Sequence, residues 1–563
     1  MDTVTSTKIP LRDPNVVMKL DRMGSFHQSR LSFMRVLLRR LKRENWTFDR
    51  PVFEIDENGV GVGVYSAHGP DRSYSLVAFA HDLPPEQRSD RVIATAWDAT
   101  FTLFDGVPTR EDIDRLAANV PYQEAGRVSS KELSVSRANR SVRLWEYVVD
   151  TLSKGQQPDA AKVAEVGYLM RTTAVYGSGK LGAADREVTS DRPEFVGPFQ
   201  IEMLSVFLTR NFVMDLVDHL AKARAPETAV AMDHGLRRNF GIGNSTGLGM
   251  APYMINHPVL LNNWIVTRET ALARVRSLET AGADRVATFK DFVKRATKSA
   301  EIWHSEHPMQ IEKLAELRDG LKKLAAWLEE NDLSSDMPWN RLWLWAESNL
   351  GLEGQEQLFA LMLEPYGDLV DELADQMHAD EAPNARIDGR MSLARLKELT
   401  EDVHAWALNI DWNDRPACEN VWYTSEEKLE PRLGSRFDED VADYELPLCP
   451  GRDAVRMHAD MATSEADTVG AFLQAHPEHR HVARRVQITG KFPYAEFRDN
   501  MISDKLLPID LLRAKLAIFG ATHFDPRSDR WVRINMFQNA PFPYELASGD
   551  EDDWTMPALE DAQ

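Results

Sequence analysis

The sequence predicts a mainly α-helical α+β protein, with a large helical core between an N-terminal antiparallel sheet and a small mixed C-terminal region. Apolar and polar residues alternate over residues 47–104, which is typical of strands. Over most of residues 107–408 apolar residues recur every three or four positions, which is typical of helices. Both patterns occur after residue 409. We therefore expect three segments, residues 1–106, 107–408 and 409–563.

Composition limits the class of protein before any motif is considered. The chain has 563 residues and a net charge of −22, which argues against a nucleic-acid partner because phosphate binding needs a basic surface. It has no apolar run of the ~20 residues that a membrane helix needs, and its first residues lack the order of a signal peptide. Two cysteines provide no disulfide framework. We expect a soluble cytoplasmic protein with no membrane partner, and its fourteen tryptophans favour a homo-oligomer, most simply a dimer.

The first hundred residues contain an arm, a basic helix and the sheet. Residues 1–25 have no periodic pattern and are expected to form the arm. Residues 28–43 predict a helix whose arginines and Lys42 form a solvated face, with a polyanion-binding face as the alternative. The apolar runs on either side of Asn58 and Gly59 predict a β-hairpin with its turn at these two residues.

Helices are expected to follow residue 106. Residues 139–153 and 159–173 are amphipathic, and residues 199–222 carry the clearest apolar stripe. Pro258 opens the next helix, which Asn256 or His257 is placed to cap. Further helical patterns occupy residues 283–300, 310–330, 339–349, 355–377, 392–408, 465–473 and 508–519, and the runs RRVQIT and RWVRINMF are strand-like.

The segment Gly177–Gly182 is the first concentration of site-like residues. It matches G-x-G-x-x-G, but a helical pattern precedes it and a polar loop follows it, so it does not fit a dinucleotide site. Its glycines let backbone N–H groups face an anion, and Tyr176, Ser178 and Lys180 add side-chain donors. The alternative is a helix end and connector that simply needs glycine.

A second glycine-rich segment, residues 241–249, precedes the helix that Pro258 opens, and helix N-termini attract anions. We expect both segments to line one pocket, because they bracket the helix at residues 199–222. A buried segment that satisfies its own backbone is the alternative. Candidate anion-binding residues in and near this segment are Arg237, Arg238, Asn244, Ser245, Thr246 and Asn256. His257 is the candidate acid/base group, and helix capping is its alternative role.

Two further clusters lie in the C-terminal third. Lys428 and Arg432 belong to a charged, aromatic stretch that suits carboxylate or phosphate binding, or simply forms a solvated loop. The run from His476 to His481 contains three histidines, but a proline interrupts helical spacing and nearby arginines would repel a cation, so no metal site is expected. Tyr494, Glu496, Arg498 and Asn500 alternate as in a strand.

The function these observations favour is an enzyme that acts on a small carboxylate- or phosphate-bearing metabolite by acid/base chemistry, as a lyase or a hydrolase. The glycine-rich segments and arginines would hold the anion, while His257, Tyr176 or Lys180 moves a proton. One alternative is an oxidoreductase with a nucleotide cofactor at the glycine-rich segments. Another is a non-catalytic binding or assembly protein. The sequence leaves the cofactor unknown.

Overall fold

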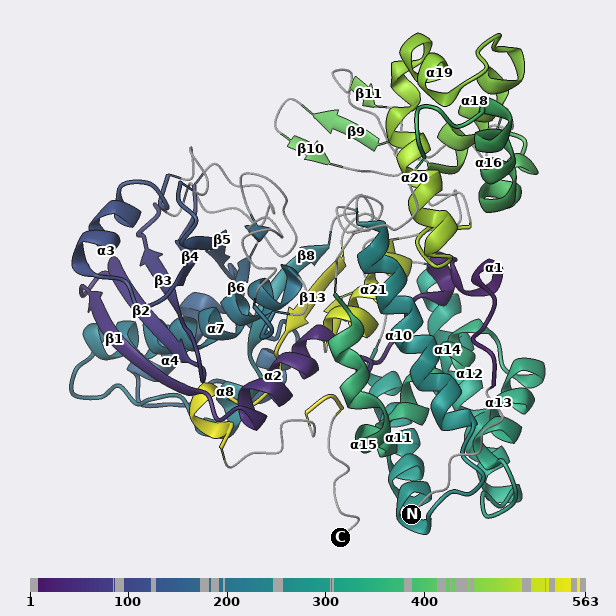
Figure 1. Cartoon of the computed structure of the whole chain (residues 1–563). Coiled ribbons are helices and arrows are strands. Elements are labelled where there is room, and N and C mark those ends of the chain that lie inside the picture. The colour runs from purple at the N-terminus through teal and green to yellow at the C-terminus, as the bar shows by residue number, and fades with distance from the viewer. Residues whose placement is uncertain are drawn as a thin grey trace. The chain divides into compact units, whose positions relative to one another are not determined.

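The computed structural model describes most of the chain (Figure 1). The described residues are 9–84, 86, 96–122, 128–172, 182–183, 192–195, 198–246, 257–303, 305, 308–378, 387–412, 422–425, 428–430, 443–445, 450–498, 508–521, 523–525, 532–547 and 554–556. Among them, no helix combines the length and the apolar character that crossing a bilayer requires.

The chain forms two compact units, each assembled from segments far apart in sequence. The helical unit comprises Met1–Ser25, Gly247–Phe289 and Lys323–Ala514. The sheet unit comprises Phe26–Thr246, Lys290–Lys322 and Lys515–Gln563. The expected division at residues 106 and 408 stays a prediction.

The sheet unit begins with the antiparallel meander that the alternating pattern predicts. Its strands are β1 (Thr47–Ile55), β2 (Gly61–His68), β3 (Ser73–Ala80) and β4 (Ala99–Asp105), each antiparallel to the next. The β1–β2 turn includes Asn58 and Gly59, as predicted. Gly59 has a φ of +80°, and the Asp56 carboxylate accepts the N–H groups of Asn58 and Val60, both at 2.9 Å.

The sheet extends well beyond the predicted meander and is mixed. It runs in the order β1-β2-β3-β4-β5-β6-β8-β13-β12, and a short strand β7 also pairs with β5. The added strands are β5 (Glu132–Arg140), β6 (Tyr168–Thr172), β7 (Gly182–Ala183), β8 (Gly241–Thr246), β12 (His523–Asp525) and β13 (Val532–Met536). Strands β6 and β8 are parallel to each other, whereas the other described pairs of this sheet are antiparallel.

The new strands correct two helix predictions. The range 139–153 contains the end of β5 and then helix α4 (Trp145–Ser153), and the range 159–173 contains helix α5 (Ala160–Ala164) and then β6. Strand β6 is buried at every residue, and β5 at nearly every one. The run YLMRT of β6 lacks the polar alternation that would distinguish a strand from a buried helix.

Helices cover both faces of the sheet. The predicted helix at residues 199–222 is α7 (Pro198–Arg224), and the Phe212 ring packs edge-on against Tyr65 and Phe101, with ring centroids 6.0 and 5.7 Å apart. On the opposite face, Ile113 and Leu116 of α3 (Arg110–Ala117) join the core cluster that includes Val64 and Val77. Neighbouring residues of a strand point to opposite faces, so this single sheet supports two cores.

The basic helix forms, but its surface differs from the expectation. It is α2 (Phe33–Arg43), which packs against α7, and Ser32 caps its first turn. Arg35 is fully buried, so the arginines do not form one solvated face. A short helix, α8 (His234–Arg238), precedes β8.

The helices of the helical unit include segments that the sequence pattern predicted and others that it did not. They are α1 (Pro14–Val17), α10 (Pro258–Arg276), α13 (Pro338–Asn349), α14 (Leu352–Leu363), α15 (Gly367–Val370), α16 (Leu393–Leu408), α18 (Pro450–Thr463), α19 (Val469–Ala475) and α20 (Arg480–Lys491). Three helices contribute residues to both units: α11 (Ala283–Ile302), α12 (Pro308–Glu330) and α21 (Pro508–Phe519). A small antiparallel sheet has the order β10-β9-β11, formed by Lys428–Glu430, Trp422–Ser425 and Asp443–Glu445.

Two strand predictions fail in this unit. The run RRVQIT lies in α20, where Val482, Ala483 and Val486 recur at helical spacing and face a hydrophobic core. Residues 494–498 form turns and bends, so the alternating polar residues do not share a strand face over the described part of that stretch. The run RWVRINMF does form a strand, β13, over residues 532–536.

The N-terminal arm is anchored by buried charge. The Arg12 guanidinium donates to both oxygens of Glu269 on α10, at 2.8 and 2.7 Å, and to Glu356 on α14 at 3.0 Å. It also lies over the Trp343 and Phe359 rings. All three charged side chains are almost completely removed from water, so the pairing offsets the cost of burying each one.

Candidate functional site

The parallel pair β6 and β8 provides the best-positioned edge of the sheet for a ligand. Thr172, the last residue of β6, pairs with Asn244 near the end of β8, so both carboxyl ends reach the same edge. Helix α7 lies between these two strands in sequence and packs on the sheet, as in a βαβ unit. In open sheets, ligands bind outside the carboxyl ends of such strands, at the point where the strand order changes.

The described parts of the two glycine-rich segments lie in strands. The first follows β6, and its last glycine, Gly182, pairs with Val135 of β5. The second begins inside β8 rather than in a loop, which corrects the expectation for residues 241–246. A side chain at Gly243 would lie 2.7 Å from the Tyr168 ring, and one at Gly241 would lie 2.5 Å from a backbone oxygen of β13. These two glycines therefore permit close strand packing, which was the structural alternative.

Asn244 joins the two parallel strands. Its side chain is buried, and its amide nitrogen donates to the Thr172 carbonyl oxygen at 3.0 Å. Its amide oxygen lies 3.5 Å from the amine nitrogen of Lys515 on α21. Asn244 thus fixes the end of β6 and also contacts a potential proton carrier.

Lys515 is the most unusual ionisable group at this edge. Its side chain is 0% exposed, and this burial lowers the pKa of the amine well below its ordinary value. Burial favours the uncharged form of an amine, which accepts a proton and acts as a nucleophile. Sequence reasoning did not single out Lys515. The only signal was a basic residue inside the apolar run LLRAKLAIF.

Comparison with known proteins gives no match. No protein family, no curated protein and no solved structure matches this chain.

A second polar cluster joins the end of β5 to residues that adjoin β3 and β4. The Asp98 carboxylate accepts the Arg140 backbone N–H at 2.9 Å, and the Asn139 side-chain oxygen accepts the Asp98 N–H at 3.2 Å. Burial lowers the pKa of His81, whose backbone N–H bonds to the Asp98 carbonyl. Because Asn139 pairs with Arg171 and Arg140 with Met170, this cluster lies beside the middle of β6, and we assign it to holding β3, β4 and β5 together.

The predicted arginines lie at the opposite end of β8. Arg237 pairs with Asp218, and Arg238 donates to Glu545 at 3.0 Å. Both belong to α8, which precedes the amino end of the strand. They are thus placed with structural partners, away from the carboxyl ends.

The other predicted residues are distributed over both units. His257 belongs to the helical unit, where it occupies the N-cap of α10 without a capping hydrogen bond from its side chain. Lys428 lies in β10, and the backbones of Ser245 and Thr246 complete β8, while their side chains are outside the described part of the chain. Tyr176, Ser178, Lys180, Asn256 and Arg432 lie outside the described residues.

Proposed function

We propose that the sheet unit is an enzyme that transfers a proton on a small carboxylate- or phosphate-bearing metabolite, in a lyase or hydrolase reaction. Lys515 is the acid/base group, and Asn244 is a contact that orients it. One observation supports this proposal above all others. A fully buried amine lies within 3.5 Å of the Asn244 amide oxygen, at the shared carboxyl end of β6 and β8.

The chemistry follows from the state of the amine. An uncharged Lys515 accepts a proton from a substrate carbon or from water, and the resulting ammonium returns that proton to the leaving group or product. The ammonium also stabilises negative charge that develops nearby, because water is excluded from the site. An ordinary lysine is uncharged in only roughly a thousandth of molecules at pH 7, so burial greatly increases the reactive form.

The glycine-rich segments remain the proposed anion-binding elements. In the sequence, one follows β6, which ends at Thr172, and the other includes β8, which ends at Thr246, two residues after Asn244. Tyr176, Ser178 and Lys180 on the first segment, and Ser245 and Thr246 on the second, are the proposed substrate contacts, while Asn256 stays a predicted anion-binding residue of the helical unit. His257 remains a predicted acid/base group of the helical unit.

Chemical labelling tests the reactive amine directly. The full chain is incubated at pH 7 with pyridoxal 5′-phosphate, used as an anionic aldehyde probe, then reduced with borohydride and mapped by peptide mass spectrometry. We expect label on Lys515 ahead of exposed lysines such as Lys154, and competition by inorganic phosphate. Label confined to exposed lysines would contradict the proposal, because a substrate site must admit a small anion.

Solvent proton exchange tests catalysis. Mixtures of small carboxylates and phosphate esters are incubated in D2O, and ¹H NMR follows loss of substrate protons or formation of products. We expect Lys515→Met and Lys515→Arg to lower the rate by ~10²-fold or more, since neither side chain supplies an uncharged amine. Lys154→Met is the matched surface control. Equal rates in the wild type and in both Lys515 variants would contradict the assignment.

A further inference from the structure

Four metal-ligating side chains meet in the helical unit, on elements that the proposal above does not use. Asp460 lies in the last turn of α18, His476 is the C-cap of α19, and Glu478 and His479 belong to the short 3-10 turn Pro477–His479. One ligand atom from each of the four lies within 4.8 Å of the others. Two imidazoles and two carboxylates make a mixed donor set, which suits a transition-metal ion rather than Ca²⁺ or Mg²⁺.

The proline that argued against a metal site is what brings the two histidines together. It opens a single 3-10 turn, in which residues three apart lie on the same side. The turn is closed by the His479 N–H, which donates to the His476 carbonyl at 3.2 Å. The two imidazole centroids are 5.9 Å apart, and both rings stack with Phe472, at 4.9 and 5.9 Å.

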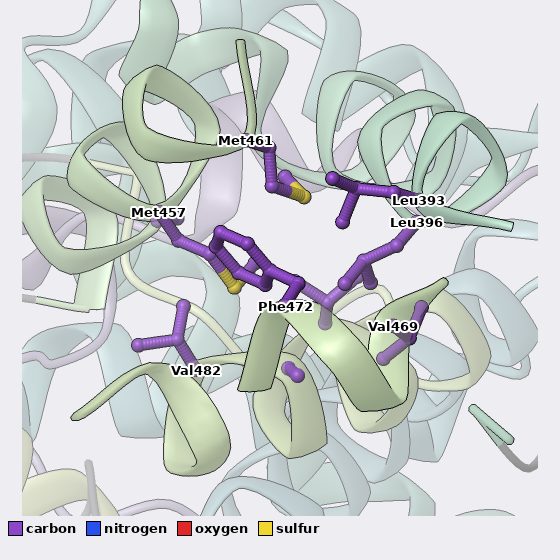
Figure 2. Close-up of a cluster of buried hydrophobic side chains, with 10 residues drawn as sticks. Leu393, Leu396, Met457, Met461, Val469, Phe472 and Val482 are labelled. Atoms are coloured by element: carbon purple, nitrogen blue, oxygen red, sulfur yellow. The ribbon is translucent and has the colours of Figure 1, made fainter. Parts of the chain in front are cut away.

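A packed core holds these elements in register. Figure 2 shows Phe472 of α19 against Met457 and Met461 of α18, with Val482 of α20 beside them. Met461 is the immediate neighbour of Asp460, and Phe472 lies one helical turn before His476. The ligand-bearing backbone is therefore fixed by buried apolar contacts before any ion binds, as a pre-organised site requires.

The local electrostatics favour a cation. Asp460 and His476 lie at the carboxyl ends of α18 and α19, where helix dipoles place partial negative charge. The amino end of α20 opposes this, but two carboxylates outweigh it. Of the arginines expected to repel an ion, Arg480 and Arg484 are exposed to solvent, and Arg485 forms an ion pair with Glu496.

We infer that Asp460, His476, Glu478 and His479 form a Zn²⁺ site. The His479 ring lies 2.6 Å from Asp460, and the His476 ring lies 3.3 Å from Glu478. Tetrahedral Zn²⁺ with bonds near 2.0–2.1 Å spaces its donor atoms about 3.3 Å apart. On Zn²⁺ binding, the distance between the His479 nitrogen and the Asp460 oxygen would therefore increase by less than ~1 Å. The longer distances between donor atoms of the cluster would decrease by at most ~1.5 Å.

Binding has a defined proton balance. Each imidazole coordinates through a neutral nitrogen, and each carboxylate through an ionised oxygen. A proton held in the His479–Asp460 or the His476–Glu478 hydrogen bond is released when the metal ion takes its place between the two side chains.

A chelator competition experiment tests this site. The full-length chain without a histidine tag is stripped with EDTA and titrated with ZnCl₂ against a chromophoric chelator, and native mass spectrometry gives the stoichiometry. We expect one Zn²⁺ per chain, and a visible absorption spectrum of tetrahedral character when Co²⁺ replaces it. Far-UV circular dichroism verifies the fold of each variant.

Matched variants locate the ion. His476→Asn and Asp460→Asn should each weaken Zn²⁺ binding by at least ~10-fold. His481→Asn, whose side chain is 70% exposed and outside the cluster, should leave binding unchanged. The His479 side chain is more buried than that of His476, so a His479 variant is more prone to misfold. The His476 variant therefore keeps the test valid if a His479 variant fails to fold. A wild type without stoichiometric Zn²⁺, or His476→Asn and Asp460→Asn binding as tightly as His481→Asn, would overturn the inference.

Discussion

Replacing His404 with phenylalanine should make the protein less sensitive to acid. His404 lies in α16 at a point where the backbone departs from helical geometry, with φ −113° and ψ 23°. Its side chain is 1% exposed, and no described residue forms a hydrogen bond with either ring nitrogen. Burial lowers the pKa of His404 to about 4; Arg485 and Arg498 act in the same direction, while Glu496 opposes them.

The size of the effect follows from this lowered pKa. In the unfolded chain the imidazole titrates near 6.5, so between pH 6.5 and 4 the unfolded state binds a proton that the folded state excludes. The stability of the folded state therefore falls as the pH decreases through this window, and is unaffected by this group above it. At 1.36 kcal/mol per pKa unit, the loss is about 3 kcal/mol.

Urea unfolding followed by circular dichroism at several pH values measures this loss. His404→Phe should match or exceed wild-type stability at pH 7, because phenylalanine has a similar shape and leaves no buried polar atom unpaired. Its advantage over the wild type should then grow by about 3 kcal/mol between pH 7 and pH 4. His481→Asn, which replaces an exposed histidine of the same unit, is the control. A constant difference between His404→Phe and the wild type at all pH values would refute the reasoning.

Two further substitutions test the fold. Arg12→Met leaves Glu269 and Glu356 buried without their main counter-charge, and it should lower the free energy of unfolding in urea by about 3–5 kcal/mol. Arg395→Met, which removes an exposed ion pair, should lower it by less than ~1 kcal/mol. Similar losses in both variants would contradict the role of burial. Gly59→Val forces a β-branched residue to a φ of +80° and places its Cβ 2.9 Å from Leu220. The melting temperature of this variant should therefore fall by an amount equivalent to about 1–3 kcal/mol. An unchanged melting temperature would show that the turn relaxes freely.

The meander could be predicted because its signals are local. Strands β1 to β4 follow one another, and the turn at Gly59 uses residue types with a known conformational preference. The rest of the sheet depends on pairings that no local pattern encodes. RWVRINMF is recognisable as a strand, but nothing in it indicates that Ile534 pairs with Asn244.

Of the two residues at the centre of the candidate site, the sequence indicated Asn244 but not Lys515. Asn244 stood out because it lies among glycines and hydroxyl residues, and the structure places its amide oxygen 3.5 Å from the Lys515 amine nitrogen. Lys515 could not be found in this way, because a single lysine in an apolar helix usually extends its amine to water. The Zn²⁺ ligands were visible as a histidine-rich run, but the proline was interpreted as a disruption and Asp460 lies too far upstream to be associated with them.

The position of β13 in the chain has a consequence for biosynthesis. The strand lies between β8 and β12 in the sheet, yet Val532 is synthesised about 290 residues after Thr246, which takes roughly 15–60 s at ~5–20 residues per second. Throughout that interval the nascent chain presents an unpaired β8 edge beside strands that are already complete, and such edges template aggregation. Newly made chains should therefore depend on chaperones until β13 emerges from the ribosome, and a late stop codon should cause insolubility rather than a shortened but well-folded product.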